Sequence, residues 1–186
     1  MVVGLALRLL TAKQPMQEFL SASVMLNEKK FIIIGNQNAI TCKEIFPYFQ
    51  KDELWFGTSH VKEFKTPCGE IQKFGNICWY TNIENKNRNT PLDLYKRYSN
   101  EYPKYDNYDA IEVSKVSDIP MDYNGIMGVP ISFLHKYNPE QFEIAGMAED
   151  NGKGFSGDAN WNGKNPHCVI NGKNMFKRIF IRKRNA

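Results

Sequence analysis

Apolar and polar residues in the first 50 positions alternate between helix-like and strand-like spacing. After a proline, apolar side chains at positions 16, 19, 20, 24 and 26 recur as on one helix face, which predicts a helix over residues 15–28. The run FIIIG at 31–35 is apolar throughout and predicts a strand buried on both faces. Thr41, followed three residues later by Glu44, resembles a capping box and predicts a helix over residues 42–50.

Two aromatic and β-branched runs follow, at residues 53–57 (ELWFG) and 75–82 (GNICWYTN). Each predicts a strand, and residues 60–67 between them predict a loop or irregular ribbon, which favours antiparallel pairing. A strand flanked by two helices and followed by such a pair is typical of an open α/β sheet with an antiparallel edge. Because only about three strands are apparent, we expect this sheet to be incomplete.

The second half of the chain is richer in turn-forming residues. Residues 91–98 predict a short helix, and the segments 110–113, 129–134 and 141–147 predict strands, the second weakened by Pro130. The remainder is expected to hold a loop at 149–166 and strands at 168–171 and 175–182.

Residues 102–133 have little helical period and an unusual composition. Tyrosine combines an apolar ring with a polar tip, which suits a surface that stacks on a partner and hydrogen-bonds to it. The tyrosines of this run lie among Asn, Lys, Asp, Pro and Gly, which favours a recognition surface. The residues concerned are Tyr102, Tyr105, Tyr108, Tyr123, Lys104, Asn107 and Asn124.

Charge adds one feature to this pattern. The net charge of +4 over 186 residues is modest and does not by itself indicate nucleic acid. Residues 171–184 contain six basic residues and no acid, and Lys177, Arg178 and Arg182 lie among apolar residues. They form either a final element with a solvated basic tail or an edge that contacts phosphates.

Few catalytic or metal-binding motifs are present. The sequence GKGFSG at 152–157 matches GxGxxG, but the residues after it cannot form the helix that a dinucleotide site requires. The four cysteines are irregularly spaced without a CxxC pair, so we expect reduced thiols and no metal. The apolar start of the chain is too short to span a bilayer and resembles no signal peptide, so we expect a cytoplasmic protein without membrane contact.

Several long and unusual blocks resemble the C-terminal half of EcoRI-type adenine-specific DNA methyltransferases. The similarity is close over residues 28–147 and looser at the end of the chain. The blocks are FIIIGNQNAITCKEIFP (31–47), FGNICWYTNI (74–83), PLDLYKRY (91–98), YPKYDNYDAIEVSKVSDIPMDYNGIMGVPISFLHKYNPEQFEI (102–144) and NGKNMFKRIFIRKR (171–184).

The resemblance implies an S-adenosylmethionine-dependent enzyme of a restriction–modification system that methylates N6 of adenine in double-stranded DNA. Such an enzyme needs a Gly-rich turn for the cofactor, an [N/D]PP[F/Y/W] loop for the adenine and a region that reads the sequence. The first two are absent here, since the chain contains no Pro-Pro pair and no usable glycine loop. We therefore expect a truncated chain that binds no cofactor and is inactive alone, with a missing N-terminal fragment as a possible partner.

The resemblance also implies roles for individual residues. Residues 1–83 would be the C-terminal part of a Rossmann-like methyltransferase domain, and residues 84–186 a mixed, loop-rich DNA-recognition region. Trp79 or Tyr80 would stack on the flipped target base, and strand alternation allows only one of them to face the pocket.

Arginine and lysine side chains suit contacts with guanine or phosphate, and asparagine suits contacts with adenine. Tyr105 and Tyr108 would either form hydrogen bonds to phosphates or pack within the loop. The expected DNA-binding residues are Arg88, Lys104, Tyr105, Asn107, Tyr108, Asn124, Lys177, Arg178 and Arg182. A non-catalytic DNA-binding module and a gene remnant without function remain the alternatives.

Overall fold

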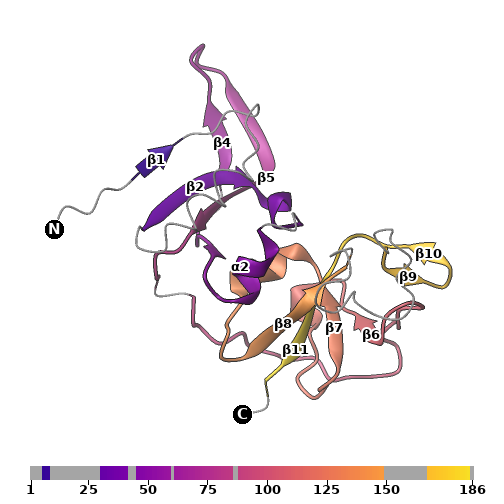
Figure 1. Cartoon of the computed structure of the whole chain (residues 1–186). Coiled ribbons are helices and arrows are strands. Elements are labelled where there is room, and N and C mark those ends of the chain that lie inside the picture. The colour runs from indigo at the N-terminus through magenta and orange to yellow at the C-terminus, as the bar shows by residue number, and fades with distance from the viewer. Residues whose placement is uncertain are drawn as a thin grey trace. The chain divides into compact units, whose positions relative to one another are not determined.

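A computed structural model describes residues 6–8, 30–41, 45–59, 61–85, 88–148 and 167–184. The chain forms two compact units, residues 1–88 and 89–186. Both are built mainly of strands with short helical segments, so the protein is of mixed α/β type (Figure 1).

The first unit contains a mixed sheet of five strands. Its order is β1-β2-β5-β3, with β4 paired to β5. The pair β1/β2 is parallel, whereas β5 runs antiparallel to β2, β3 and β4, so that β2 and β3 run parallel to each other. The strands are β1 (Ala6–Arg8), β2 (Phe31–Asn36), β3 (Trp55–Phe56), β4 (Val61–Lys65) and β5 (Ile71–Thr81). The predicted antiparallel pairing of the second and third strands is confirmed, with Trp55 opposite Thr81.

One face of this sheet is covered by the short helix α2 (Phe46–Gln50). Phe49 of the helix packs edge-on against Phe56 of β3, with ring centroids 5.0 Å apart, and both rings contact Tyr80 of β5. In β2, burial alternates between buried and half-buried side chains, so the prediction of a strand buried on both faces is wrong. The alternation arises because these aromatic rings fill only one side of the sheet.

Thr41 is the last residue of a 3₁₀ helix and not the N-cap of the helix that follows. The chain enters the 3₁₀ helix η1 (Gln37–Thr41) after β2, and Thr41 donates its hydroxyl hydrogen bond back to Asn38 O at 2.8 Å. Helix α2 begins at Phe46 without a side-chain cap, and its first turn contains Pro47, which needs no hydrogen-bond acceptor there. Residues 42–44 and the predicted helix at 15–28 lie outside the described residues.

The segment at 60–67, predicted as a loop or irregular ribbon, includes one strand of a two-stranded ribbon. Residues 61–65 form β4, which pairs with an extension of β5 that begins at Ile71, four residues before the predicted start. Three of the five residues of β4, Lys62, Glu63 and Lys65, are charged, and this polar content concealed the strand in the sequence.

The second unit contains a four-stranded sheet with order β6-β7-β11-β8. Strands β6 and β7 are parallel, and β11 is antiparallel to both β7 and β8. The elements are β6 (Ala110–Glu112), η2 (Val116–Asp118), β7 (Ile126–Val129), η3 (Ile131–Lys136), β8 (Phe142–Met147), β9 (Val169–Ile170), β10 (Lys173–Asn174) and β11 (Ile179–Lys183). Part of its core is a cluster that includes Tyr105, Tyr108 and Phe180.

Two predictions in this unit are wrong. Residues 91–98 are not helical, because Leu92 bonds through both N–H and C=O to the Gln141 side chain and Lys96 pairs with the chain at Pro120. The strand predicted at 129–134 ends at Val129, since Pro130 cannot donate to a ladder and instead begins η3. The strands predicted at 110–113 and 141–147 are confirmed, and those near the C-terminus are divided among β9, β10 and β11. The predicted loop at 149–166 lies outside the described residues.

None of the described helical segments is long and apolar enough to cross a membrane.

Candidate functional site

The first unit contains a cavity of about 310 Å³ on the sheet face opposite α2. Its wall is the half-buried indole of Trp79 on β5, and Ile32 of β2 adds apolar surface. The cavity is lined by Ile32, Gly57, Thr58, Ser59, Trp79, Thr81, Ile83, Glu84 and Asn85.

The structure separates the two aromatic residues that the sequence left as alternatives. Tyr80 points to the α2 face, is 0% exposed, and donates from its hydroxyl to Asn36 O at 2.8 Å. Trp79 points to the opposite face and lines the cavity. Strand alternation thus leaves Trp79 as the residue able to stack on a ligand, and Tyr80 as core.

Gly57 holds Trp79 in place from the neighbouring strand. Its N–H donates to Trp79 O at 2.8 Å, and a Cβ at position 57 would lie only 2.8 Å from Trp79 Cβ. Glycine is therefore required for the close approach of the two strands at this point. Sequence analysis missed this residue, although a glycine directly after an aromatic strand was the available signal.

The polar rim of the cavity is fixed by hydrogen bonds to the main chain. Thr81 is buried, donates to Phe31 O at 2.7 Å and accepts from Ile83 N at 3.0 Å, while Trp55 Nε1 donates to Ile83 O at 3.0 Å. Thr58 and Ser59 are exposed. An aromatic wall, an apolar floor and a rim of hydroxyl, amide and carboxylate groups suit a planar ligand with polar edges.

Arg88 lies beside this rim and is held there by three groups. Its guanidinium pairs with Asp52, pairs with Glu84 at 2.6 Å, and stacks with Cζ 3.6 Å from the centroid of the Trp55 ring. Only 8% of its side chain is exposed. These contacts favour a structural role for Arg88 over contact with DNA.

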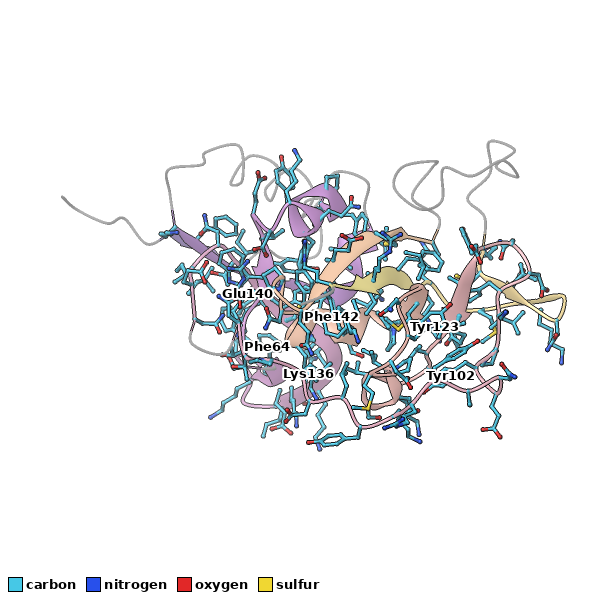
Figure 2. The ribbon with its side chains drawn as sticks, turned by 90° about the horizontal axis from the view of Figure 1, so that it is seen from below. Phe64, Tyr102, Tyr123, Lys136, Glu140 and Phe142 are labelled. Atoms are coloured by element: carbon cyan, nitrogen blue, oxygen red, sulfur yellow. The ribbon has the colours of Figure 1, made fainter. Side chains whose placement is uncertain are left out.

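The tyrosine-rich run divides into a buried part and a surface part. Tyr105 and Tyr108 pack against Phe180, with ring centroids 5.8 and 4.7 Å from it, and both are 6% exposed. Their burial favours the packing role that the sequence left open. Tyr102 and Tyr123 (Figure 2) are half-buried. Both stack with Tyr98, which precedes the run, with ring centroids 5.9 and 4.6 Å from it.

A buried ion pair lies beneath Tyr105. Arg178 Nη2 donates to Glu112 Oε1 at 2.6 Å, its Nε lies 3.0 Å from both carboxylate oxygens, and Tyr105 donates to Oε2. Burial lowers the pKa of Arg178, but the hydrogen bond and charge of Glu112 more than offset this and raise it. Burial, with the bond to Glu112, raises the pKa of Tyr105. Arg178 is therefore an anchor of the core, with 8% of its surface exposed.

The remaining predicted DNA contacts differ in exposure. Asn107 bridges two parts of the chain, donating to His167 O at 2.6 Å and accepting from Val169 N at 3.0 Å. Lys104 and Asn124 are exposed, and Arg182 is exposed with Glu143 3.2 Å away. Lys177 is half-buried.

A second cavity, of about 370 Å³ and mostly polar, lies in the second unit. Lys96 and Arg97, both exposed, are basic residues at this cavity that sequence analysis did not single out. Its lining comprises Lys96, Arg97, Ser99, Glu101, Tyr102, Pro103, Glu112, Val113, Ser114 and Asp118. Among the residues that the structure covers, no group of three His, Cys, Asp or Glu side chains could hold a metal ion.

The fold and its cavities define a mixed α/β protein with an aromatic-walled pocket, and comparison with known proteins gives the family. The model of the family described as adenine-specific methyltransferase EcoRI matches residues 14–184. The chain therefore belongs to this family.

Three relatives are similar over much of the chain. It is 41% identical over 169 residues to type II methyltransferase M.EcoRI of Escherichia coli, in a match that covers 79% of this chain and 51% of the relative. It is 38% identical over 150 residues (69% and 47%) to M.MgeORF184P of Mycoplasma genitalium, and 36% identical over 138 residues (62% and 43%) to M.MpnI of Mycoplasma pneumoniae. The chain thus spans about half the length of these curated relatives. No solved structure matches.

Proposed function

We propose that this chain supplies the target-base pocket and the DNA-recognition surface of an S-adenosylmethionine-dependent, site-specific adenine-N6 methyltransferase of a restriction–modification system. The family match and the relatives named type II methyltransferases support the enzyme class. The observation that carries the proposal is the cavity walled by Trp79.

The chemistry of adenine methylation gives this cavity its role. An enzyme that acts on the exocyclic amino group must flip the base out of the duplex and hold it by stacking. In the proposal, the adenine ring lies against Trp79, and its edges face the polar cavity residues Thr58 and Ser59. Base–aromatic stacking contributes about 1–3 kcal/mol in nucleic-acid complexes, enough to hold an unpaired base.

The fold supports different roles for the first and second parts of the chain. A sheet in which β5 lies antiparallel between the mutually parallel β2 and β3 is consistent with the edge of an incomplete Rossmann-like methyltransferase sheet. In the proposal, residues 1–83 form this part and residues 84–186 read the DNA. The exposed Lys104, Asn124 and Arg182 are the best placed of the predicted contacts.

The described residues do not fit the cofactor. Strand β2 leads into a 3₁₀ helix instead of a glycine turn, and the space beside Gly57 after β3 is filled by Trp79. The sequence also lacks a Pro-Pro pair. We therefore propose that cofactor binding and the [N/D]PP[F/Y/W] loop come from residues outside this sequence, and that the chain transfers no methyl group alone.

A reconstitution assay tests this function. The chain is incubated with plasmid DNA and methyl-labelled cofactor, alone and with the portion of the E. coli relative that the chain does not match. We expect incorporation into adenine only with both parts. Incorporation by the chain alone would refute the assignment of the cofactor site to other residues.

Substitutions at the cavity test the role of Trp79 in the reconstituted enzyme. Trp79→Phe keeps an aromatic face and should retain most activity, whereas Trp79→Ala should lose about 10-fold or more, as expected for a lost stacking contact. Gly57→Ala should also lower activity because its Cβ would displace Trp79. Equal activity of the Phe and Ala variants would contradict a stacking role.

The exposed cations of the second unit favour a second candidate function, a DNA-binding module without catalysis. Lys96, Arg97, Lys104 and Lys115 are all exposed. A module of this kind would bind DNA with strong salt dependence but would give no methyl transfer in any reconstituted mixture.

A further inference from the structure

The first unit carries a two-stranded ribbon that extends beyond its sheet. The ribbon consists of β4 and the first six residues of β5, Ile71 to Asn76 (Figure 1). These six residues of β5 are all exposed. At its base, Val61 pairs with Ile77 next to an irregularity in the register. This segment therefore contributes little to the core of its own unit.

The two faces of the ribbon differ in chemistry. Phe64 lies opposite Gln72, and its ring contacts that of Phe74 edge-on with centroids 5.3 Å apart, so these three side chains share one face. Glu63 lies opposite Lys73 and Lys65 opposite Ile71 on the other face. One face is thus aromatic with an amide, and the other is mainly charged.

The tip of the ribbon is an ordered turn. Thr66 N donates to Glu70 O at 2.8 Å, Glu70 N donates to Thr66 Oγ1 at 3.1 Å, and Gly69 adopts a φ of +88° that favours glycine. A ribbon fixed by its turn loses less conformational entropy when it binds than a disordered loop would.

Exposure and charge together indicate what the ribbon contacts. Phe74 on the aromatic face is 37% exposed, and an exposed aromatic ring gains no stability from contact with water. Lys62 and Lys65 are exposed and form no ion pair with any residue that the structure describes, whereas Lys73 has Glu63 at 3.8 Å. Apolar surface flanked by unpaired lysines is complementary to a polyanion that also offers apolar surface. The major groove of DNA has both properties, and its width admits a two-stranded β-ribbon.

We propose that this ribbon enters the major groove of the DNA substrate with its Phe64–Gln72–Phe74 face toward the bases. The Gln72 amide then bonds an adenine edge, the phenylalanine rings contact thymine methyl groups, and Lys62 and Lys65 contact phosphates. The inference rests on the proposed function, to which it adds a reading element in the first unit, separate from residues 84–186.

The test uses the full chain and a fluorescein-labelled duplex with a randomised central segment, followed by selection and sequencing of the bound pool. Phe74→Ala and Gln72→Ala should each weaken binding to the selected sequence about 10-fold, and Gln72→Ala should relax the preference for adenine at one position. Lys65→Gln should weaken binding to all sequences and reduce the salt slope by about one. Ile71→Ala, which alters a more exposed apolar residue on the opposite face, is the control and should change binding less than 2-fold.

The outcomes separate this inference from the function on which it rests. If the unaltered chain fails to bind DNA at low salt, the proposed function fails, and this inference with it. If it binds and the Phe74 and Gln72 variants bind equally well with the same preference, only the ribbon assignment is overturned. An equal loss for Ile71→Ala would overturn the assignment of the reading face. If the ribbon variants bind DNA normally but associate less well with the other methyltransferase portion, the ribbon docks on protein. That result would also overturn the ribbon assignment. Thermal unfolding of each variant should match the parent chain, because these side chains lie outside the core.

Discussion

Removal of the buried guanidinium of Arg178 should destabilise the second unit more than any loss of a surface ion pair. Arg178→Met fills a similar volume but leaves the Glu112 carboxylate, 3% exposed, without its counter-charge. The variant loses the bond at 2.6 Å and the two Nε contacts at 3.0 Å. The Tyr105 hydroxyl and Ser114 Oγ, 3.1 Å away, are then the remaining partners of the carboxylate.

The magnitude follows from the burial of both partners. Removing one partner of a buried ion pair lowers the free energy of unfolding by about 3–5 kcal/mol, because the other charge stays buried without its counter-charge. For the 98 residues of this unit (89–186), each kcal/mol shifts Tm by about 4–8 °C, so Arg178→Met should lower Tm by about 12–40 °C. Arg182→Met is the matched control, since Arg182 is 52% exposed in its pair with Glu143, and such pairs contribute about 0–1 kcal/mol.

Urea unfolding followed by circular dichroism measures both variants. A combined Tyr105→Phe, Glu112→Leu and Arg178→Met variant should recover most of the loss, because it removes the whole polar network together. The reasoning would be refuted if Arg178→Met cost no more than Arg182→Met, or if the combined variant were less stable than Arg178→Met alone.

Two further predictions concern close packing and thiol chemistry. Gly128→Ala should destabilise the second unit by about 1–3 kcal/mol, because its Cβ would lie 2.8 Å from Tyr105 Cζ, and an unchanged urea midpoint would contradict this. Burial raises the pKa of the Cys78 thiol to about 12, so this thiol should react slowly with an alkylating reagent at pH 8. In a variant with the other two cysteines replaced by serine, the exposed Cys68 should be alkylated at least 100-fold faster than Cys78. Comparable rates for the two thiols, measured by mass spectrometry, would contradict the burial of Cys78.

The sequence predicted those elements whose hydrophobic pattern is local. Residues 53–57 and 75–82 were identified as an antiparallel pair because aromatic and β-branched residues are concentrated in both. Residues 61–65 were predicted only as a loop or irregular ribbon, because three of the five are charged and the segment shows no apolar alternation. Residues 91–98 were predicted as a helix because nothing in that segment shows that Gln141, far along the chain, binds its backbone.

The candidate site could be predicted only up to a pair of residues. Alternation along a strand implies that Trp79 and Tyr80 face opposite ways, but the covered face depends on α2, whose Phe49 packs on Tyr80. Arg178 was predicted to belong to the basic tail, whereas in the structure it is buried in an ion pair with Glu112. The available signal was a single acid within the apolar run AIEV, which indicates a buried partner of opposite charge.

Titration of a labelled, mixed-sequence duplex with the full chain, without cofactor and at several salt concentrations, tests the central claim most directly. If the chain is the DNA-recognition part of an adenine methyltransferase, it binds at low salt, and its affinity falls linearly on a log–log plot with a slope of about −0.9 per phosphate contacted. Absence of binding at the lowest salt concentration, by a chain that unfolds cooperatively, would contradict the claim.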